Sequence, residues 1–201
     1  MYEIYLQSFV LYFVVIDPFG TTPIFMSLTK HQNAKEKIKS ALEGVLTATI
    51  ILILFSIVGN FLLSYLNISL GAFKIAGGII LFIISLEMLF DKRQERKEKD
   101  IENVSNNIAI FPLAIPLLSG PAAITSVIVI ISQFGDNLTY QLMGTISLLS
   151  VMLITFILFF VVSKSQQFFN KKVINVFSRV IAIILAGLSV QYIIDGVISL
   201  I

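Results

Sequence analysis

Two proline-containing stretches decide the fold of this chain: Asp17-Pro18-Phe19-Gly20-Thr21-Thr22-Pro23 and Pro116-Leu117-Leu118-Ser119-Gly120-Pro121. Each places two prolines five residues apart inside an apolar segment, and so removes backbone donors where a helix needs them. In hydrocarbon, an unsatisfied backbone group is so costly that such a break persists only where protein or a water-filled cavity surrounds it. We therefore interpret the two stretches as two halves of one site.

The composition around these stretches is that of a membrane protein. The chain has 201 residues, 57% hydrophobic and 13% charged, with a mean hydropathy of +0.94. Several apolar runs of about 18 residues or more are typical of membrane-spanning helices. We expect an all-α integral membrane protein with six transmembrane helices, approximately at Tyr5–Thr29, Leu42–Leu66, Ile68–Phe90, Ile108–Ile131, Leu138–Ser163 and Val173–Ile198.

Few residues could support metal or thiol chemistry. The chain has no cysteine, which excludes disulfides and thiolate ligands, and its single histidine, His31, follows Lys30 in a polar stretch. We expect His31 in a surface loop and no metal site or cofactor. The first apolar segment lacks a basic region before it and contains the first proline stretch, so we expect it to be retained as helix one rather than cleaved.

Positive charge is confined to alternate connections between the segments. All Lys and Arg residues except Lys74 and Arg179 lie in the first, third and fifth connections. Cytoplasmic loops are enriched in Lys and Arg, so we place these three connections in the cytoplasm and both termini outside it.

A charged segment divides the chain into two halves. Residues 91–107 form a polar linker, which we expect to be cytoplasmic, between residues 1–90 and 108–201 of one membrane domain, 1–201. Three helices per half force the second half to enter the membrane in the opposite direction, so related halves must form an inverted repeat. Pro116 and Pro121 follow Pro18 and Pro23 at a constant offset of 98 residues, which supports such a relation.

Each proline stretch fits a helix that ends, unwinds and restarts at its second proline, because proline is favoured at the first helical position. Both breaks would lie about 12 to 18 Å deep in a hydrocarbon core about 30 Å thick. A restarting helix presents free N–H groups to a carboxylate, whereas freed carbonyls and hydroxyls suit an ammonium group or a coupling H+ or Na+. We therefore expect a zwitterionic substrate bound by Asp17, Pro18, Gly20, Thr21, Thr22, Pro23, Pro116, Ser119, Gly120, Pro121 and Thr125.

Asp17 has two interpretations. As the ionisable residue closest to the expected midplane, it is a candidate for contacting a substrate ammonium group or carrying a coupling ion. Alternatively, it caps a helix that begins at Pro18.

The third and sixth segments carry further charges and small residues. Lys74 could pair with Asp195 near the outer surface, and Glu87 with Arg179 near the inner one, as gating ion pairs. Alternatively, the cations extend to the interface and the acids lie among headgroups. Close helix approach is expected at small residues, namely Gly71, Gly77, Gly78, Ala182, Ala186 and Gly187.

The chain resembles a known family at four stretches: FVVIDPFGTTPIFMSLT from Phe13, FKIAGGIILF from Phe73, FPLAIPLLSGPAAITSVIVI from Phe111 and QYIIDGV from Gln191. They are similar to the MarC family, also called the six-helix neutral amino acid transporter family and related to LysE-type exporters. The resemblance implies a multi-pass protein of the prokaryotic inner membrane, with glycine and alanine as candidate substrates. The family commonly has Gly-Pro-Gly where this chain has Gly120-Pro121-Ala122, which puts substrate size in question.

Three classes of function remain. A secondary transporter of a small neutral amino acid is favoured, and a non-transporting membrane partner or assembly protein is the alternative. An intramembrane enzyme is disfavoured, because Ser119 lacks the preceding glycine of a rhomboid-like protease and there is no His-Glu-x-x-His motif. A transporter should have a polar cavity at the proline stretches, whereas a scaffold should have them packed. The lipid bilayer is an expected partner, a homodimer is possible, and no nucleic acid is expected.

Overall fold

The computed structural model describes residues 1–90, 92, 108–135, 137–164 and 171–201, except the side chains of 171–175 and 177. The described residues form helices and turns, with no β-strand among them. The predicted linker at 91–107 lies outside the described residues, apart from Lys92. The helical elements in chain order are α1 (Tyr2–Ile16), α2 (Pro18–Leu28), α3 (Ala34–Tyr65), α4 (Leu70–Leu89), the irregular segment η1 (Ala109–Leu118), α6 (Pro121–Gln133), α7 (Leu138–Lys164) and α8 (Lys171–Ile198).

Five helical stretches in the described part of the chain are long and apolar enough to cross a membrane. The segments η1 and α6 make a sixth candidate if they are counted together, although they are bent by 57° at their junction. The expected all-helical chain with multiple membrane spans is therefore confirmed. The first span, Tyr2–Leu28, combines α1 and α2.

Local sequence signals set the starts of α3 and α4. Asn33 caps α3 by accepting from the Glu36 backbone N–H at 3.0 Å, while the Glu36 side chain accepts from the Asn33 N–H at 2.9 Å. This reciprocal capping box satisfies two donors that a helix start would otherwise leave free. Ser69 caps α4 through the Ala72 N–H. His31 is exposed in the turn before α3, as expected.

The helix α6 forms the centre of the core. Its residues from Ala122 to Ile131 are buried except for the half-buried Ile124. A helix that is apolar and buried all round must be enclosed by other helices. In contrast, α3 exposes an apolar face that includes Ile50, 66% exposed, and Ile57, 73% exposed, as suits contact with lipid.

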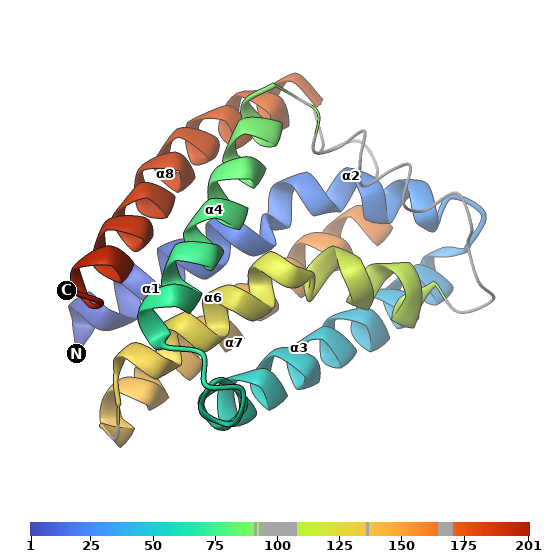
Figure 1. Ribbon diagram of the computed structural model, residues 1–201. Helices are drawn as coiled ribbons and strands as arrows, with labels where there is room; N and C mark the ends of the chain where they lie inside the picture. The colour runs from blue at the N-terminus through green and yellow to red at the C-terminus, as the bar shows by residue number, and fades with distance from the viewer. Residues whose placement is uncertain (91, 93–107, 136, 165–170) are drawn as a thin grey trace.

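The remaining helices surround this core. The most extensive contact between helices is that of α4 with α8, which lie side by side in Figure 1. Both α1 and α2 pack against α7, while α3 packs against η1, α6 and α7. The two chain termini lie near each other at the lower left of Figure 1, on the same side as the connection between α6 and α7.

Small residues allow several of these close contacts. A Cβ built at Gly71 would lie 2.9 Å from the Gly196 carbonyl oxygen of α8, and one at Gly78 would lie 2.7 Å from the Ser189 carbonyl oxygen. One at Gly77 would lie 2.5 Å from Cγ2 of Thr125 on α6. The expectation of close approach is thus confirmed for these glycines.

The same expectation is wrong for Gly187, which has no heavy atom within 4 Å of its Cβ position. Gly187 is exposed on α8, away from α4. The sequence does not reveal which side of a helix meets a neighbour, and Gly187 lies on a side of α8 that meets none among the described residues.

Candidate functional site

The two proline stretches lie in two interrupted segments that contact each other. The helix α1 packs against α6, and α2 contacts η1. Asp17 joins α1 to α2, while Ser119 and Gly120 join η1 to α6. The fold therefore brings these two interrupted segments into contact, although they are far apart in sequence, and we call this contact the crossing.

The first interruption is a single residue. Asp17 adopts a left-handed conformation, with φ 55° and ψ 66°, and donates its backbone N–H to the Phe13 carbonyl at 3.0 Å. Its carboxylate accepts from the Gly20 N–H at 3.0 Å. Asp17 is 4% exposed. The capping interpretation of Asp17 is therefore confirmed, and a direct role in binding stays a prediction.

The expected restart at Pro23 is wrong. The helix α2 already begins at Pro18, and Pro23 lies inside it. Pro18 occupies the first helical position, where a missing N–H costs nothing, and the Asp17 cap satisfies the free N–H of Gly20. The long unwound segment expected after Asp17 is therefore not formed.

The second interruption is longer and begins earlier than expected. Phe111 and Ile115 are extended within η1, and the peptide bonds that precede Pro112 and Pro116 are cis. The regular helix expected from Ile108 to Pro116 is therefore wrong. The start of α6 does coincide with the expected restart, with Gly120 at the N-cap position and Pro121 as its first residue.

The hydroxyl groups of both stretches donate to nearby carbonyls. Thr21 donates to the Asp17 carbonyl at 2.9 Å, Thr22 to the Pro18 carbonyl at 2.7 Å, and Ser119 to the Ala114 carbonyl at 2.8 Å. All three side chains are buried. In this conformation the hydroxyls stabilise the interrupted backbone, and the stretches are buried or half-buried except at Pro121, which is exposed.

Two glycines keep the junctions compact. A Cβ at Gly20 would lie 2.1 Å from Oδ2 of Asp17, and one at Gly120 would lie 2.5 Å from the Pro116 carbonyl oxygen. Thr125 is buried one turn into α6, with its methyl group against Gly77. Ala122, the residue after Pro121, is also buried.

Sequence reasoning missed two buried hydroxyl groups beside the interruptions. Tyr12 lies on α1, 1% exposed, and Ser126 lies on α6, fully buried. Neither hydroxyl has a hydrogen-bond partner within the described residues. Leaving such a group unpaired costs about 1–3 kcal/mol, so each position calls for a ligand or water. The sequence does carry a signal for them, because each is a polar residue in an apolar segment close to an interruption. Tyr12 is five residues before Asp17, and Ser126 is five residues after Pro121.

The predicted gating pairs differ in outcome. Among the described residues, Lys74 forms no ion pair with Asp195, whose Oδ1 accepts instead from the Gln191 side chain at 2.6 Å. Lys74 lies near the start of α4 and Asp195 near the end of α8, and these two helix ends are adjacent. Their pairing in another conformation therefore stays a prediction. The pairing of Glu87 with Arg179 also stays a prediction.

Comparison with known proteins agrees with this architecture. The family model described as MarC family integral membrane protein matches residues 2–201. A UPF0056 membrane protein of Methanocaldococcus jannaschii is 35% identical, covering 98% of this chain and 87% of its own length. A UPF0056 membrane protein of Archaeoglobus fulgidus is 33% identical, covering 96% and 91%.

Bacterial relatives match over similar lengths. A UPF0056 membrane protein of Aquifex aeolicus is 32% identical, covering 96% of this chain and 92% of its own length. No solved structure matches the chain. The match over nearly all residues shows that this chain belongs to the MarC family of integral membrane proteins.

Proposed function

We propose that this protein is a secondary transporter of a small neutral solute, with glycine or alanine as the first candidates. The observation that carries the proposal is the pair of buried hydroxyls on Tyr12 and Ser126, which have no hydrogen-bond partner among the described residues. They lie on α1 and α6, which pack on each other, and Tyr12 also lies near Tyr192 of α8. Buried polar groups without protein partners are suited to a ligand that binds between these helices.

The binding chemistry follows from the helix junctions. The start of α6 directs free backbone N–H groups and a positive dipole end toward its N-terminus, which suits a substrate carboxylate. Asp17 provides the complementary negative charge from the α1–α2 junction. Opening of the crossing would release the hydroxyls of Thr21, Thr22 and Ser119 for the substrate or for a coupling H+ or Na+.

We further propose that the two halves of the chain are inverted repeats. The helix pairings support this proposal, because α1 and α2 pack on α7 as α6 and η1 pack on α3. Likewise, α8 packs on α1 and α2, and its counterpart α4 packs on α6. The remaining counterparts contact each other directly, α3 with α7 and α4 with α8. Alternating access in inverted repeats exchanges the roles of the two halves around a shared site.

The proposed location is the prokaryotic cytoplasmic membrane, with both termini outside the cytoplasm. The basic residues Lys30, Lys35 and Lys39 precede or begin α3, whereas the termini carry no Lys or Arg. This asymmetry is the one that the positive-inside rule requires.

A non-transporting membrane partner is the second candidate function. It is favoured by the packing of the proline stretches, where Thr21, Thr22 and Ser119 are buried and bonded to local carbonyls. A transporter explains the same packing as an occluded state. Direct measurement of transport separates the two proposals.

Counterflow of labelled glycine and alanine in proteoliposomes tests the proposal. Wild type should accumulate label, and Tyr12→Phe and Ser126→Ala should each reduce the rate about three- to tenfold, the effect of one lost net hydrogen bond. Ser27→Ala, on an exposed position of α2, is the matched control and should transport normally.

Stability gives a second readout for the same variants. Removing an unpartnered buried hydroxyl should leave the unfolding temperature in detergent unchanged or higher. Folded, correctly oriented protein without counterflow would reject glycine and alanine as substrates. Normal counterflow in both hydroxyl variants would reject this crossing as the binding site.

A further inference from the structure

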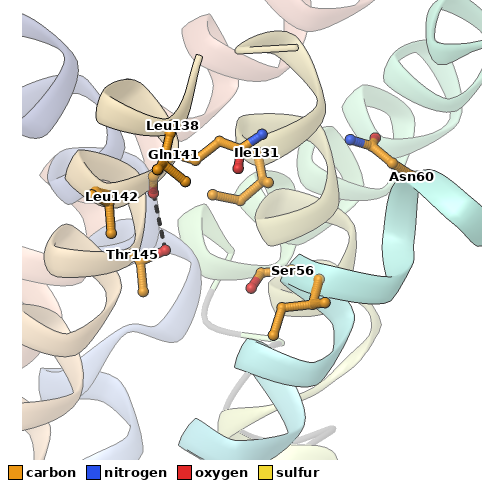
Figure 2. A pocket seen from close by; sticks show the side chains of 8 residues that line it. Ser56, Asn60, Ile131, Leu138, Gln141, Leu142 and Thr145 are labelled. Carbon is orange, nitrogen blue, oxygen red and sulfur yellow. Dashed lines mark hydrogen bonds between the residues drawn. The ribbon is translucent and has the colours of Figure 1, made fainter. Parts of the chain in front are cut away.

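A separate cavity of about 230 Å³ lies between α3, α6 and α7. Figure 2 shows Leu138, Gln141, Leu142 and Thr145 of α7 on one side, with Ser56 and Asn60 of α3 on the other. The cavity opens to the surface, because its lining residues Ile57, Leu138 and Leu142 are exposed. A water molecule occupies about 30 Å³ in the liquid, so one small organic molecule would fit. Ile131, which contributes to its wall, is ten residues beyond Pro121, or about 15 Å along α6.

The walls of this cavity are held by close helix contacts. A Cβ at Gly59 of α3 would lie 2.7 Å from Cγ1 of Ile128, and one at Gly144 of α7 would lie 3.2 Å from Cδ1 of Ile131. Both glycines therefore bring their helices against α6. Tight packing on both sides of α6 makes a preformed cavity, as is usual for small-molecule sites.

The hydrogen-bonding capacity of the lining is only partly used. Ser132 donates to Oδ1 of Asn60, and Gln141 donates through Nε2 to the Gly135 carbonyl. The hydroxyls of Ser56 and Thr145 donate to carbonyls of their own helices at 2.7 and 2.9 Å. In the described part of the chain, Asn60 Nδ2 and Gln141 Oε1 keep a donor and an acceptor available.

The charge of the lining selects the class of ligand. All eight lining residues are uncharged, and Ile57, Ile131, Leu138 and Leu142 supply apolar surface. A charged ligand would find no counter-charge among these residues, whereas a neutral polar group can use the two amides. A short apolar portion would cover the leucine and isoleucine side chains.

We propose that this cavity is a second binding site, for a small uncharged molecule that carries a carboxamide or hydroxyl group beside a short apolar portion. Such a group is found in free solutes and in the heads of neutral lipids. Occupancy would hold the end of α6 between α3 and α7. The proposal does not depend on transport at the crossing, since no residue of the proline stretches lines the cavity.

The absence of cysteine makes a single-cysteine experiment clean. Thr145→Cys and Ser56→Cys place one thiol on each side of the cavity, and Ser27→Cys places one on the exposed face of α2. The rate of alkylation by iodoacetamide is measured with purified protein, with and without isobutyramide. Isobutyrate and isobutylammonium are charged probes of nearly the same shape.

Isobutyramide should slow alkylation of both cavity thiols, about tenfold at about ten times its Kd, and leave Ser27→Cys unaffected. The charged probes should give no protection. Adding Ser56→Leu to Thr145→Cys should fill the cavity and abolish protection, while Pro121→Ala should retain it. Failure of isobutyramide to protect either thiol, or equal protection by the charged probes, would overturn the proposal.

Native membranes identify the source of the natural ligand. If a neutral lipid head fills the cavity, the thiols should react slowly in membranes without added probe and rapidly after lipid removal. If a free solute binds, they should react rapidly in both and be protected by isobutyramide in both. Either pattern supports the neutral site, whereas unreactive thiols in both preparations would contradict an accessible cavity.

Discussion

At the residue scale, the geometry at Asp17 explains how α1 can give way to α2 within one residue. Its left-handed backbone ends α1, and its carboxylate starts α2 by accepting from Gly20. Asp and Asn tolerate this conformation better than other residues with a side chain, and both are good helix caps. Gly20 must stay small, because a Cβ there would lie 2.1 Å from the Asp17 carboxylate.

Substitution of Asp17 separates the cap from the charge. Asp17→Asn should preserve the unfolding free energy, because asparagine tolerates the same backbone conformation and caps equally well. Asp17→Ala should lower it by about 0.5–2 kcal/mol through loss of the cap. Unfolding in detergent, followed by circular dichroism, measures both effects.

Transport by these variants then tests the role of the charge. A stable Asp17→Asn protein that has lost counterflow would assign the carboxylate to substrate or ion binding. Full counterflow and unchanged ion dependence in Asp17→Asn would limit the residue to capping.

At the element scale, α6 is held by glycines from three neighbours. Gly59 of α3, Gly77 of α4 and Gly144 of α7 each bring a helix against it. Gly77 and Gly78 are adjacent in sequence but serve different contacts, with α6 and α8 respectively. Close packing through small residues is a main source of helix association in membranes, so these contacts should dominate the stability of α6.

The contact between Gly77 and Thr125 can be tested by compensation. Gly77→Ala should destabilise the protein by about 1–3 kcal/mol, because the new methyl would lie 2.5 Å from Cγ2 of Thr125. Thr125→Ser removes that methyl group, so the double variant should recover part of the loss. A double-mutant cycle of unfolding free energies in detergent measures the coupling.

Gly187→Ala is the matched control for this cycle. Its new methyl would meet no atom within 4 Å, so the change should be neutral or stabilise α8 by up to about 1 kcal/mol. Additive effects of Gly77→Ala and Thr125→Ser would contradict the packing described for α4 and α6.

At the scale of the whole molecule, the helix contacts support the proposed inverted repeat, and both termini lie on the same side of the bundle (Figure 1). An even number of crossings is required for termini on one side. The packed crossing of α1 with α6 and α2 with η1 then places the candidate site between the halves. In the proposed transport cycle, motion of one half against the other opens this site.

The proposed topology predicts the behaviour of reporters. A reporter enzyme that works only outside the cytoplasm should be active when fused after Ile201, and one that works only in the cytoplasm should be inactive there. The reason is that the basic connections are expected inside the cytoplasm and the C-terminus outside it. A single cysteine at Ser40, near the basic start of α3, should react with an impermeant reagent only from the cytoplasmic side. A cytoplasmic signal from the Ile201 fusion would overturn this orientation.

The sequence by itself determined the class of the protein and several helix boundaries. Long apolar runs require membrane-spanning helices because backbone groups must be satisfied within the bilayer. Pro121 marks the start of α6, as expected, through proline geometry that depends on only a few neighbouring residues. The caps at Asn33 and Ser69 are equally local, but α3 begins at Ala34, eight residues before the expected Leu42.

Only the tertiary structure decided how these elements combine into sites. Asp17 caps α2, which begins at Pro18, so no unwound segment follows it. Whether the hydroxyls of Tyr12 and Ser126 find a hydrogen-bond partner depends on which helices enclose them, and among the described residues they find none. The cavity beside Asn60 and Gln141 joins three helices that are separated in sequence. Periodicity and capping act over one or two turns, whereas enclosure of a polar group depends on packing between distant segments.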